Sequence, residues 1–170
     1  RPRAIWRYLD EVSAFRPDAH AFGFKLILGQ LREAPELPAI LAARRYRLIV
    51  LLRDNLFEGA VSRRVMDVTG DAHGRSANDV RERVVRLEPD PLIREMRRRK
   101  RGIEILRSLR RAWPLPAVEV RYDDLVSNQS DALRPVLKIL RVQGEPIEVA
   151  SPLKRRVQRP YTEFIENFDE

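Results

Sequence analysis

Five apolar residues in succession, Leu48 to Leu52, constrain the fold more than any other stretch of this 170-residue chain. Charge flanks the run on both sides, which is typical of a strand that is buried on both faces, as in a parallel sheet. The next residues, Arg53-Asp54-Asn55, lead into an amphipathic run that predicts a helix. Asp54 or Asn55 can cap this helix, because either side chain can accept a hydrogen bond from an unpaired backbone N–H.

The predicted helix has an apolar side and a small polar side. Its apolar residues recur at helical spacing and predict a buried stripe of Phe57, Val61, Val65 and Val68. Asn55, Gly59 and Ser62 share a different face, which is small and polar, so that a ligand could approach it closely.

Arg53 lies where the strand gives way to the helix, and ligands bind at this edge of open α/β sheets. Arg53 and Ser62 could hold one phosphate, through the guanidinium fork and the hydroxyl group. On spacing alone, a pairing of Arg53 with a nearby carboxylate is the better explanation, with Ser62 as a spacer, because short motifs have many false positives.

Other runs extend the pattern to the rest of the chain. Strands are predicted at Ala21 to Leu28 and Ala117 to Tyr122, and helices at Arg1 to Phe15, Glu36 to Arg45, Asp90 to Pro114, Ser130 to Gly144 and Tyr161 to Phe168. A turn is expected at Asp123-Asp124-Leu125. Strands that alternate with helices predict an α/β fold around a mostly parallel sheet, and the length suits a single domain over residues 1–170.

Composition excludes several kinds of chemistry. The chain has no cysteine, so disulfides, thiolate metal sites and a cysteine nucleophile are excluded, and a reducing, cytoplasmic location is expected. His20 and His73 lack metal-ligand spacing and are interpreted as surface residues. No run has the length of a membrane span, and the start has no signal-peptide pattern.

The net charge of +8 is carried mostly by arginine and suits an anionic ligand. Residues 94–101 hold six cationic residues in eight: Arg94, Arg97, Arg98, Arg99, Lys100 and Arg101. They could form a patch for a nucleic acid or a polyanionic acceptor. The wet face of an amphipathic helix is the better explanation, because helical spacing spreads the charges around the axis and no aromatic residue interleaves with them.

Four stretches resemble one enzyme family in order and spacing. Arg53-Asp54-Asn55-Leu56 through Ala60-Val61-Ser62 resembles the 3′-phosphate-binding segment of sulfotransferases that use 3′-phosphoadenosine-5′-phosphosulfate (PAPS). The other stretches are Phe22-Gly23-Phe24-Lys25-Leu26, Arg121-Tyr122-Asp123-Asp124-Leu125, and Leu153-Lys154 leading to Ile165-Glu166-Asn167-Phe168. The resemblance covers most of the chain and is nearest to the bacterial carbohydrate sulfotransferases of the nodulation-factor and trehalose type.

This resemblance implies the sulfotransferase version of the P-loop nucleotide-binding fold. It implies transfer of a sulfuryl group from PAPS to a hydroxyl of a carbohydrate or glycolipid acceptor, with no metal. Arg53 and Ser62 would grip the 3′-phosphate of the donor, and Tyr122 would lie near the adenine. Lys154 and Arg155 would belong to a late loop that closes over the same phosphate. Lys25 would face the active site and is a candidate for the catalytic step.

One departure from the family concerns the loop that cradles the 5′-phosphosulfate through backbone N–H groups. Nothing like it is found in this sequence, so we expect an amino-terminally incomplete domain without the first strand and loop. Ile27 stands where some relatives have a catalytic histidine, and the base is unassigned. We therefore expect this half alone to be marginally stable and unable to transfer sulfate. The alternatives are a pseudoenzyme that binds adenosine 3′,5′-bisphosphate, or an arginine-rich nucleic-acid-binding module.

Overall fold

The computed structural model describes residues 2–14, 21–69, 84–144 and 160–169, and they belong to two compact units. The first unit contains Arg1–Leu52 and Glu104–Ile147, and the second contains Arg53–Ile103 and Glu148–Glu170. The described residues are mostly helical, with one two-stranded parallel sheet, so the expected mixed α/β character is confirmed. The single domain and the sulfotransferase form of the fold stay predictions.

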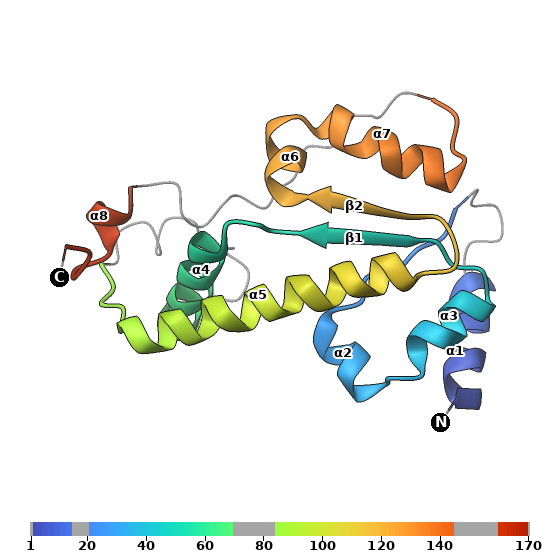
Figure 1. Cartoon of the computed structure of the whole chain (residues 1–170), viewed down its shortest axis with the longest axis horizontal. Helices are drawn as coiled ribbons and strands as arrows, with labels where there is room; N and C mark the ends of the chain where they lie inside the picture. Colours follow the sequence, from blue (N-terminus) through green and yellow to red (C-terminus); the bar gives the residue numbers. More distant parts are fainter. Residues whose placement is uncertain (1, 15–20, 70–83, 145–159, 170) are drawn as a thin grey trace. The chain divides into compact units, whose positions relative to one another are not determined.

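The helices and strands follow the sequence pattern closely in most places (Figure 1). The first unit holds α1 (Pro2–Ala14), α2 (Leu28–Glu33), α3 (Leu37–Ala43), β1 (Leu48–Leu52), β2 (Ala117–Arg121), α6 (Tyr122–Ser127) and α7 (Gln129–Leu140). The second unit holds α4 (Leu56–Thr69) and α8 (Tyr161–Phe164), and α5 (Pro89–Ala112) begins in the second unit and ends in the first. Of the helices that the structure describes, none has the length and apolar character needed to cross a membrane.

The sheet consists of β1 and β2, which run parallel and side by side (Figure 1). Leu48 pairs with Ala117 and Leu52 with Arg121, so the two strands end at the same edge. Ile49 and Leu51 of β1 are 43% and 53% exposed. The prediction that both faces of this strand are buried is therefore wrong, because side chains alternate between faces and only one face of β1 is covered.

The segment before α2 also differs from its prediction. Residues 21–27 have no regular secondary structure, so the strand expected at Ala21 to Leu28 is wrong. The ring of Phe24 instead makes an edge-on contact with Tyr46, with centroids 5.6 Å apart, and a tilted contact with Phe22. This segment packs through its aromatic rings, and Lys25 within it is exposed.

The core of the first unit lies between its amino-terminal helices. Leu9 of α1 is almost fully buried and packs with the buried residues Leu37, Ile40 and Leu41 of α3. The indole Nε1 of Trp113 donates a hydrogen bond of 3.1 Å to the carbonyl oxygen of Tyr46. A third difference from the predictions lies after β2, where the expected turn at Asp123-Asp124-Leu125 is part of helix α6.

The core of the second unit joins three distant stretches of sequence. One buried cluster contains Val61, Val65, Val85, Leu87, Phe164 and Ile165. Backbone hydrogen bonds link Val85 N–H to the Phe164 carbonyl at 2.8 Å and Glu166 N–H to the Val85 carbonyl at 3.1 Å. The amide of Asn167 adds two bonds of 3.0 Å to the backbone of Leu87. These contacts fix α4 in a unit whose other parts lie far away in the sequence.

Helix α4 confirms the predicted cap. Asn55 Oδ1 accepts a hydrogen bond of 3.0 Å from the backbone N–H of Glu58, which satisfies one of the unpaired donors at the helix start. Val61 and Val65 are buried, as the stripe predicts, but Val68 is 58% exposed. The stripe therefore ends one turn earlier than the sequence indicates.

Candidate functional site

The candidate site lies at the start of α4 in the second unit. Arg53 lies two residues before the helix cap Asn55, and Glu58, Gly59 and Ser62 follow within the first two turns. Positions three and four apart lie on one side of a helix, so these three residues share a face. Val61 and Val65 lie beside this face and pack in the core, Glu58 and Gly59 are buried, and Ser62 is half-buried.

Arg53 is oriented by an ion pair with a carboxylate. Its Nη2 lies 2.5 Å from Glu58 Oε1, and the side chain of Glu58 is only 11% exposed. The pairing that spacing alone favours is therefore confirmed. A guanidinium group has five N–H donors and a carboxylate engages two at most, so a paired arginine can still bind an anion. Glu58 would then share Arg53 with the ligand or give way to it.

A second arginine reaches the same face from α5. A Cβ atom added at Gly59 would lie 2.9 Å from Nη1 and 3.3 Å from Cζ of Arg99. The guanidinium of Arg99 therefore lies directly over the bare backbone of Gly59, one turn before Ser62. Glu95, one turn earlier on α5, holds this arginine through an ion pair of 2.8 Å between Glu95 Oε1 and Arg99 Nε.

Burial and the neighbouring charges act together on the guanidinium group of Arg99. Burial lowers the pKa of Arg99, and the positive charges of Arg98 and Arg53 lower it further, against the opposing effect of Glu95. Two part-buried guanidinium groups thus influence each other through space. Arg53 is the smallest of these influences on Arg99, and each of the two arginines already has a carboxylate partner, Glu58 for Arg53 and Glu95 for Arg99.

Glu95 stays ionised in this environment. Burial acts to raise its pKa, but the hydrogen bonds and charges of Arg98 and Arg99 outweigh that effect, and the pKa is lowered. The hydrogen bond to Glu95 raises the pKa of Arg98. At neutral pH, Glu95 is therefore a fixed negative charge that positions two arginines.

The other residues that the sequence predicts at the site lie either in the first unit or outside the described residues. Lys25 is exposed in the first unit, and Tyr122, half-buried, is the first residue of α6 directly after β2. Lys154 and Arg155 lie outside the described residues, as do His20 and His73. The structure thus places Arg53 and Ser62 in one unit, and it assigns Lys25 and Tyr122 to the other.

The sequence analysis missed Glu58, Glu95 and Arg99 as parts of this site. The spacing of Glu95 and Arg99 is four residues, which is a recognisable helical ion pair. Nothing local shows that Arg99 lies against Gly59, since this contact joins helices forty positions apart in the sequence. The interpretation of residues 94–101 as the wet face of a helix agrees with five of the six cations, which are exposed, whereas the side chain of Arg99 is only 31% exposed.

The second half of α5 bears on the nucleic-acid alternative. In the first unit, Arg107 Nη2 lies 3.0 Å from Glu119 Oε1, and Arg110 Nε lies 3.6 Å from Glu119 Oε2. A stripe of cations along α5 is the feature that this alternative requires. The carboxylate on β2 partly neutralises that stripe.

Among the described residues, no group of three or more His, Asp or Glu side chains is arranged to hold a metal ion.

Comparison with known proteins found no relative of this chain. No family model, curated protein or solved structure matches it.

Proposed function

We propose that this chain binds the adenosine 3′,5′-bisphosphate part of PAPS through the 3′-phosphate, as the donor-selecting half of a carbohydrate sulfotransferase. The observation that carries the proposal is the position of Arg99 over Gly59 on the small polar face of α4, with Arg53 close enough to act on its charge. The resemblance of the segment from Arg53 to Ser62 to the 3′-phosphate-binding segment of sulfotransferases supports the same assignment.

The chemistry of these side chains suits a terminal phosphate. Arg53 can offer two parallel N–H donors, Ser62 one hydroxyl donor, and Arg99 a second charged donor above Gly59. A phosphate dianion at this position would compete with Glu58 and Glu95 for the two guanidinium groups. Tyr122, Lys154 and Arg155 stay predicted contacts of the nucleotide.

The proposed reaction transfers a sulfuryl group. The acceptor hydroxyl oxygen attacks sulfur, the bond from sulfur to the phosphate oxygen of the donor breaks, and the hydroxyl proton passes to a base. Adenosine 3′,5′-bisphosphate leaves. Such transfers depend on the positioning of the two substrates and on the stabilisation of charge. Binding of the 3′-phosphate would position the donor. Lys25 stays a candidate for the catalytic step.

Isothermal titration calorimetry tests the proposal with two nucleotides that differ by one phosphate. Each charged contact to the 3′-phosphate should contribute about 1.5–3 kcal/mol, so adenosine 3′,5′-bisphosphate should bind at least about tenfold more tightly than AMP. Adenosine 2′,5′-bisphosphate is the control, because it has the same composition with one phosphate moved. Equal affinities for the three nucleotides would contradict the proposal.

Gly59 provides a separate prediction, because its missing side chain makes room for Arg99. Gly59→Ala should leave the free energy of unfolding unchanged or raise it by up to about 1 kcal/mol, since alanine is the better helix former. The added methyl group should displace Arg99 and weaken the binding of adenosine 3′,5′-bisphosphate about fivefold. Urea unfolding and calorimetry measure the two effects separately.

A double-mutant cycle with Arg99→Gln supplies the control for this prediction. If Gly59→Ala acts by displacing Arg99, it should have no further effect on affinity once Arg99 is replaced. An equal loss of affinity in both backgrounds would show that Gly59 acts in some other way.

A further inference from the structure

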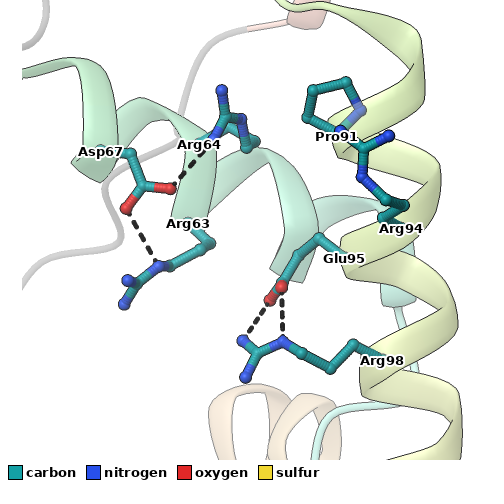
Figure 2. A pocket seen from close by; sticks show the side chains of 7 residues that line it. All are labelled: Arg63, Arg64, Asp67, Pro91, Arg94, Glu95 and Arg98. Carbon is teal, nitrogen blue, oxygen red and sulfur yellow. Dashed lines mark hydrogen bonds and ion pairs between the residues drawn. The ribbon is translucent and has the colours of Figure 1, made fainter.

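A groove lies in the second unit, between α4 and the first half of α5 (Figure 2). It is open to solvent and has a volume of about 390 Å³. Its lining consists of Arg63, Arg64 and Asp67 from α4 and Pro91, Arg94, Glu95 and Arg98 from α5. Neither Arg53 nor Ser62 is among these residues, but Glu95 is, so the groove adjoins the candidate site described above and shares this one carboxylate with it.

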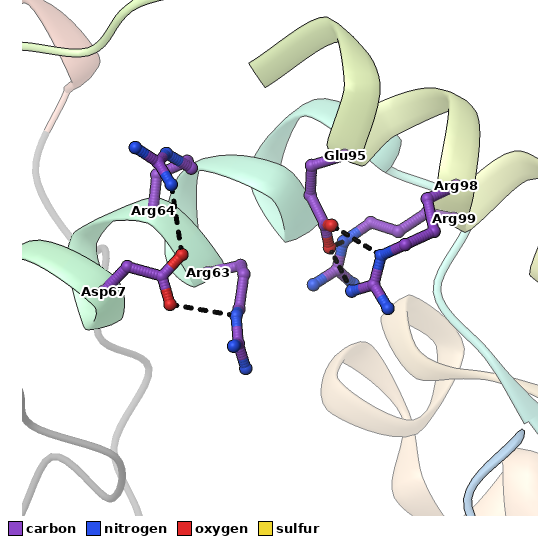
Figure 3. A network of polar contacts seen from close by, with 6 residues as sticks. All are labelled: Arg63, Arg64, Asp67, Glu95, Arg98 and Arg99. Atoms are coloured by element: carbon purple, nitrogen blue, oxygen red, sulfur yellow. Dashed lines mark hydrogen bonds and ion pairs between the residues drawn. The ribbon is translucent and has the colours of Figure 1, made fainter. Parts of the chain in front are cut away.

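The two carboxylates of the groove each bind two arginines. Asp67 lies 3.1 Å from Arg63 Nε and 3.2 Å from Arg64 Nη1, on the α4 side. Figure 3 shows Asp67 between these two arginines, and Glu95 facing Arg98 and Arg99 on the α5 side. The acids therefore orient the guanidinium groups through pairs within each helix that are themselves partly exposed to solvent.

The groove keeps an excess of positive charge after these pairings. Four lining arginines face two lining carboxylates, which leaves a formal charge of +2 at neutral pH. Arg94 belongs to this set, and its side chain is exposed. Because the acids already restrict Arg63, Arg64 and Arg98, a ligand would lose less side-chain entropy on binding than at a set of unrestrained arginines.

We propose that this groove is a second anion-binding site, for a small molecule that carries two or more phosphate, sulfate or carboxylate groups. Arginines on both walls can then bind separate oxyanion groups of one ligand. The volume lies in the range of small-molecule sites, and all the lining residues except Pro91 are charged. A nucleic-acid strand is disfavoured, because the lining offers no aromatic ring on which a base could stack.

The ligand of the groove could be a free inorganic anion or a sugar that carries phosphate groups. Two probes that each carry two phosphate groups distinguish these possibilities. Inorganic pyrophosphate represents the free anion, and glucose 1,6-bisphosphate represents two phosphates on a sugar. Calorimetry on the full chain gives the affinities, and the Nε–Hε resonances of the arginines locate the site. We expect pyrophosphate or the sugar bisphosphate to bind and to shift the Arg98 and Arg64 signals.

Single charge-removing variants test the location. Arg94→Gln should weaken binding of the tighter probe about fivefold, as expected for one solvent-exposed charged contact. Arg97→Gln is the matched control, because Arg97 is exposed on the same helix and does not line the groove. Circular dichroism confirms that each variant is folded.

Three results would overturn the proposal. Equal losses in Arg94→Gln and Arg97→Gln would show a general charge effect without a site. A loss in Arg53→Gln alone would assign the probes to the candidate site at the start of α4. Tighter binding of a single-stranded oligonucleotide than of either probe would assign the groove to nucleic acid. Because the proposal does not depend on PAPS, it survives if adenosine 3′,5′-bisphosphate fails to bind.

Discussion

Replacing Arg53 by glutamine should remove most of the preference for adenosine 3′,5′-bisphosphate over AMP. Arg53 supplies a charged two-pronged donor at the edge where β1 ends, and glutamine keeps a polar side chain without the charge. A loss of about 1.5–3 kcal/mol corresponds to roughly tenfold to 150-fold weaker binding of the bisphosphate. The affinity for AMP should change little, because AMP lacks the phosphate that Arg53 binds.

Calorimetric titration of both nucleotides into wild type and variant measures this effect. Arg97→Gln is the matched control for the lost charge, since Arg97 is an exposed arginine of α5. Arg53→Gln also removes the ion pair between Arg53 and Glu58, and this loss could lower the stability of the protein. Urea unfolding of the variant must therefore accompany each titration. If the affinities for both nucleotides fall by the same factor in a folded Arg53→Gln variant, Arg53 does not recognise the 3′-phosphate.

The second large effect concerns the stability of the unit that holds the site. Phe164 is 6% exposed and packs in the cluster with Val61 and Val65 of α4. Phe164→Ala should lower the free energy of unfolding by about 3–5 kcal/mol, from lost burial and the cavity left behind. Since typical domains have only about 5–15 kcal/mol of stability, this variant should also lose ligand binding.

Phe168→Ala is the control, because it makes the same change at a residue that is 42% exposed. Its ring stacks against Tyr161, with centroids 6.2 Å apart, and a smaller loss is expected because less of the ring is buried. Urea denaturation followed by circular dichroism compares the two variants. Equal losses would mean that Phe164 does not hold α4 in its place.

The parts of the fold that local chemistry determines could be predicted from the sequence. The apolar run of β1 forms a parallel strand, and Asn55 caps α4, because a strand of that composition and a cap next to its helix need few distant partners. The errors lie where tertiary contacts decide. Residues 21–27 form no strand, and Val68 is exposed because the core that covers Val61 and Val65 does not extend to it.

The same distinction applies to the candidate site. Arg53 and Ser62 could be chosen because both belong to one short segment with a strand before it and a helical face within it. Arg99 could not, because its position depends on how α5 passes Gly59. The groove of Arg63, Arg64, Arg94 and Arg98 also required two helices to meet, although each arginine is visible in the sequence.

Structure determination of the complex with adenosine 3′,5′-bisphosphate tests the central claim most directly. We expect the 3′-phosphate at hydrogen-bonding distance, about 2.7–3.2 Å, from the guanidinium of Arg53 and the hydroxyl of Ser62, with Arg99 beside it. Glu58 should share Arg53 with the phosphate or turn away from it. A nucleotide whose 3′-phosphate lies in the groove lined by Arg63 and Arg94, or away from Arg53 altogether, would contradict the assignment.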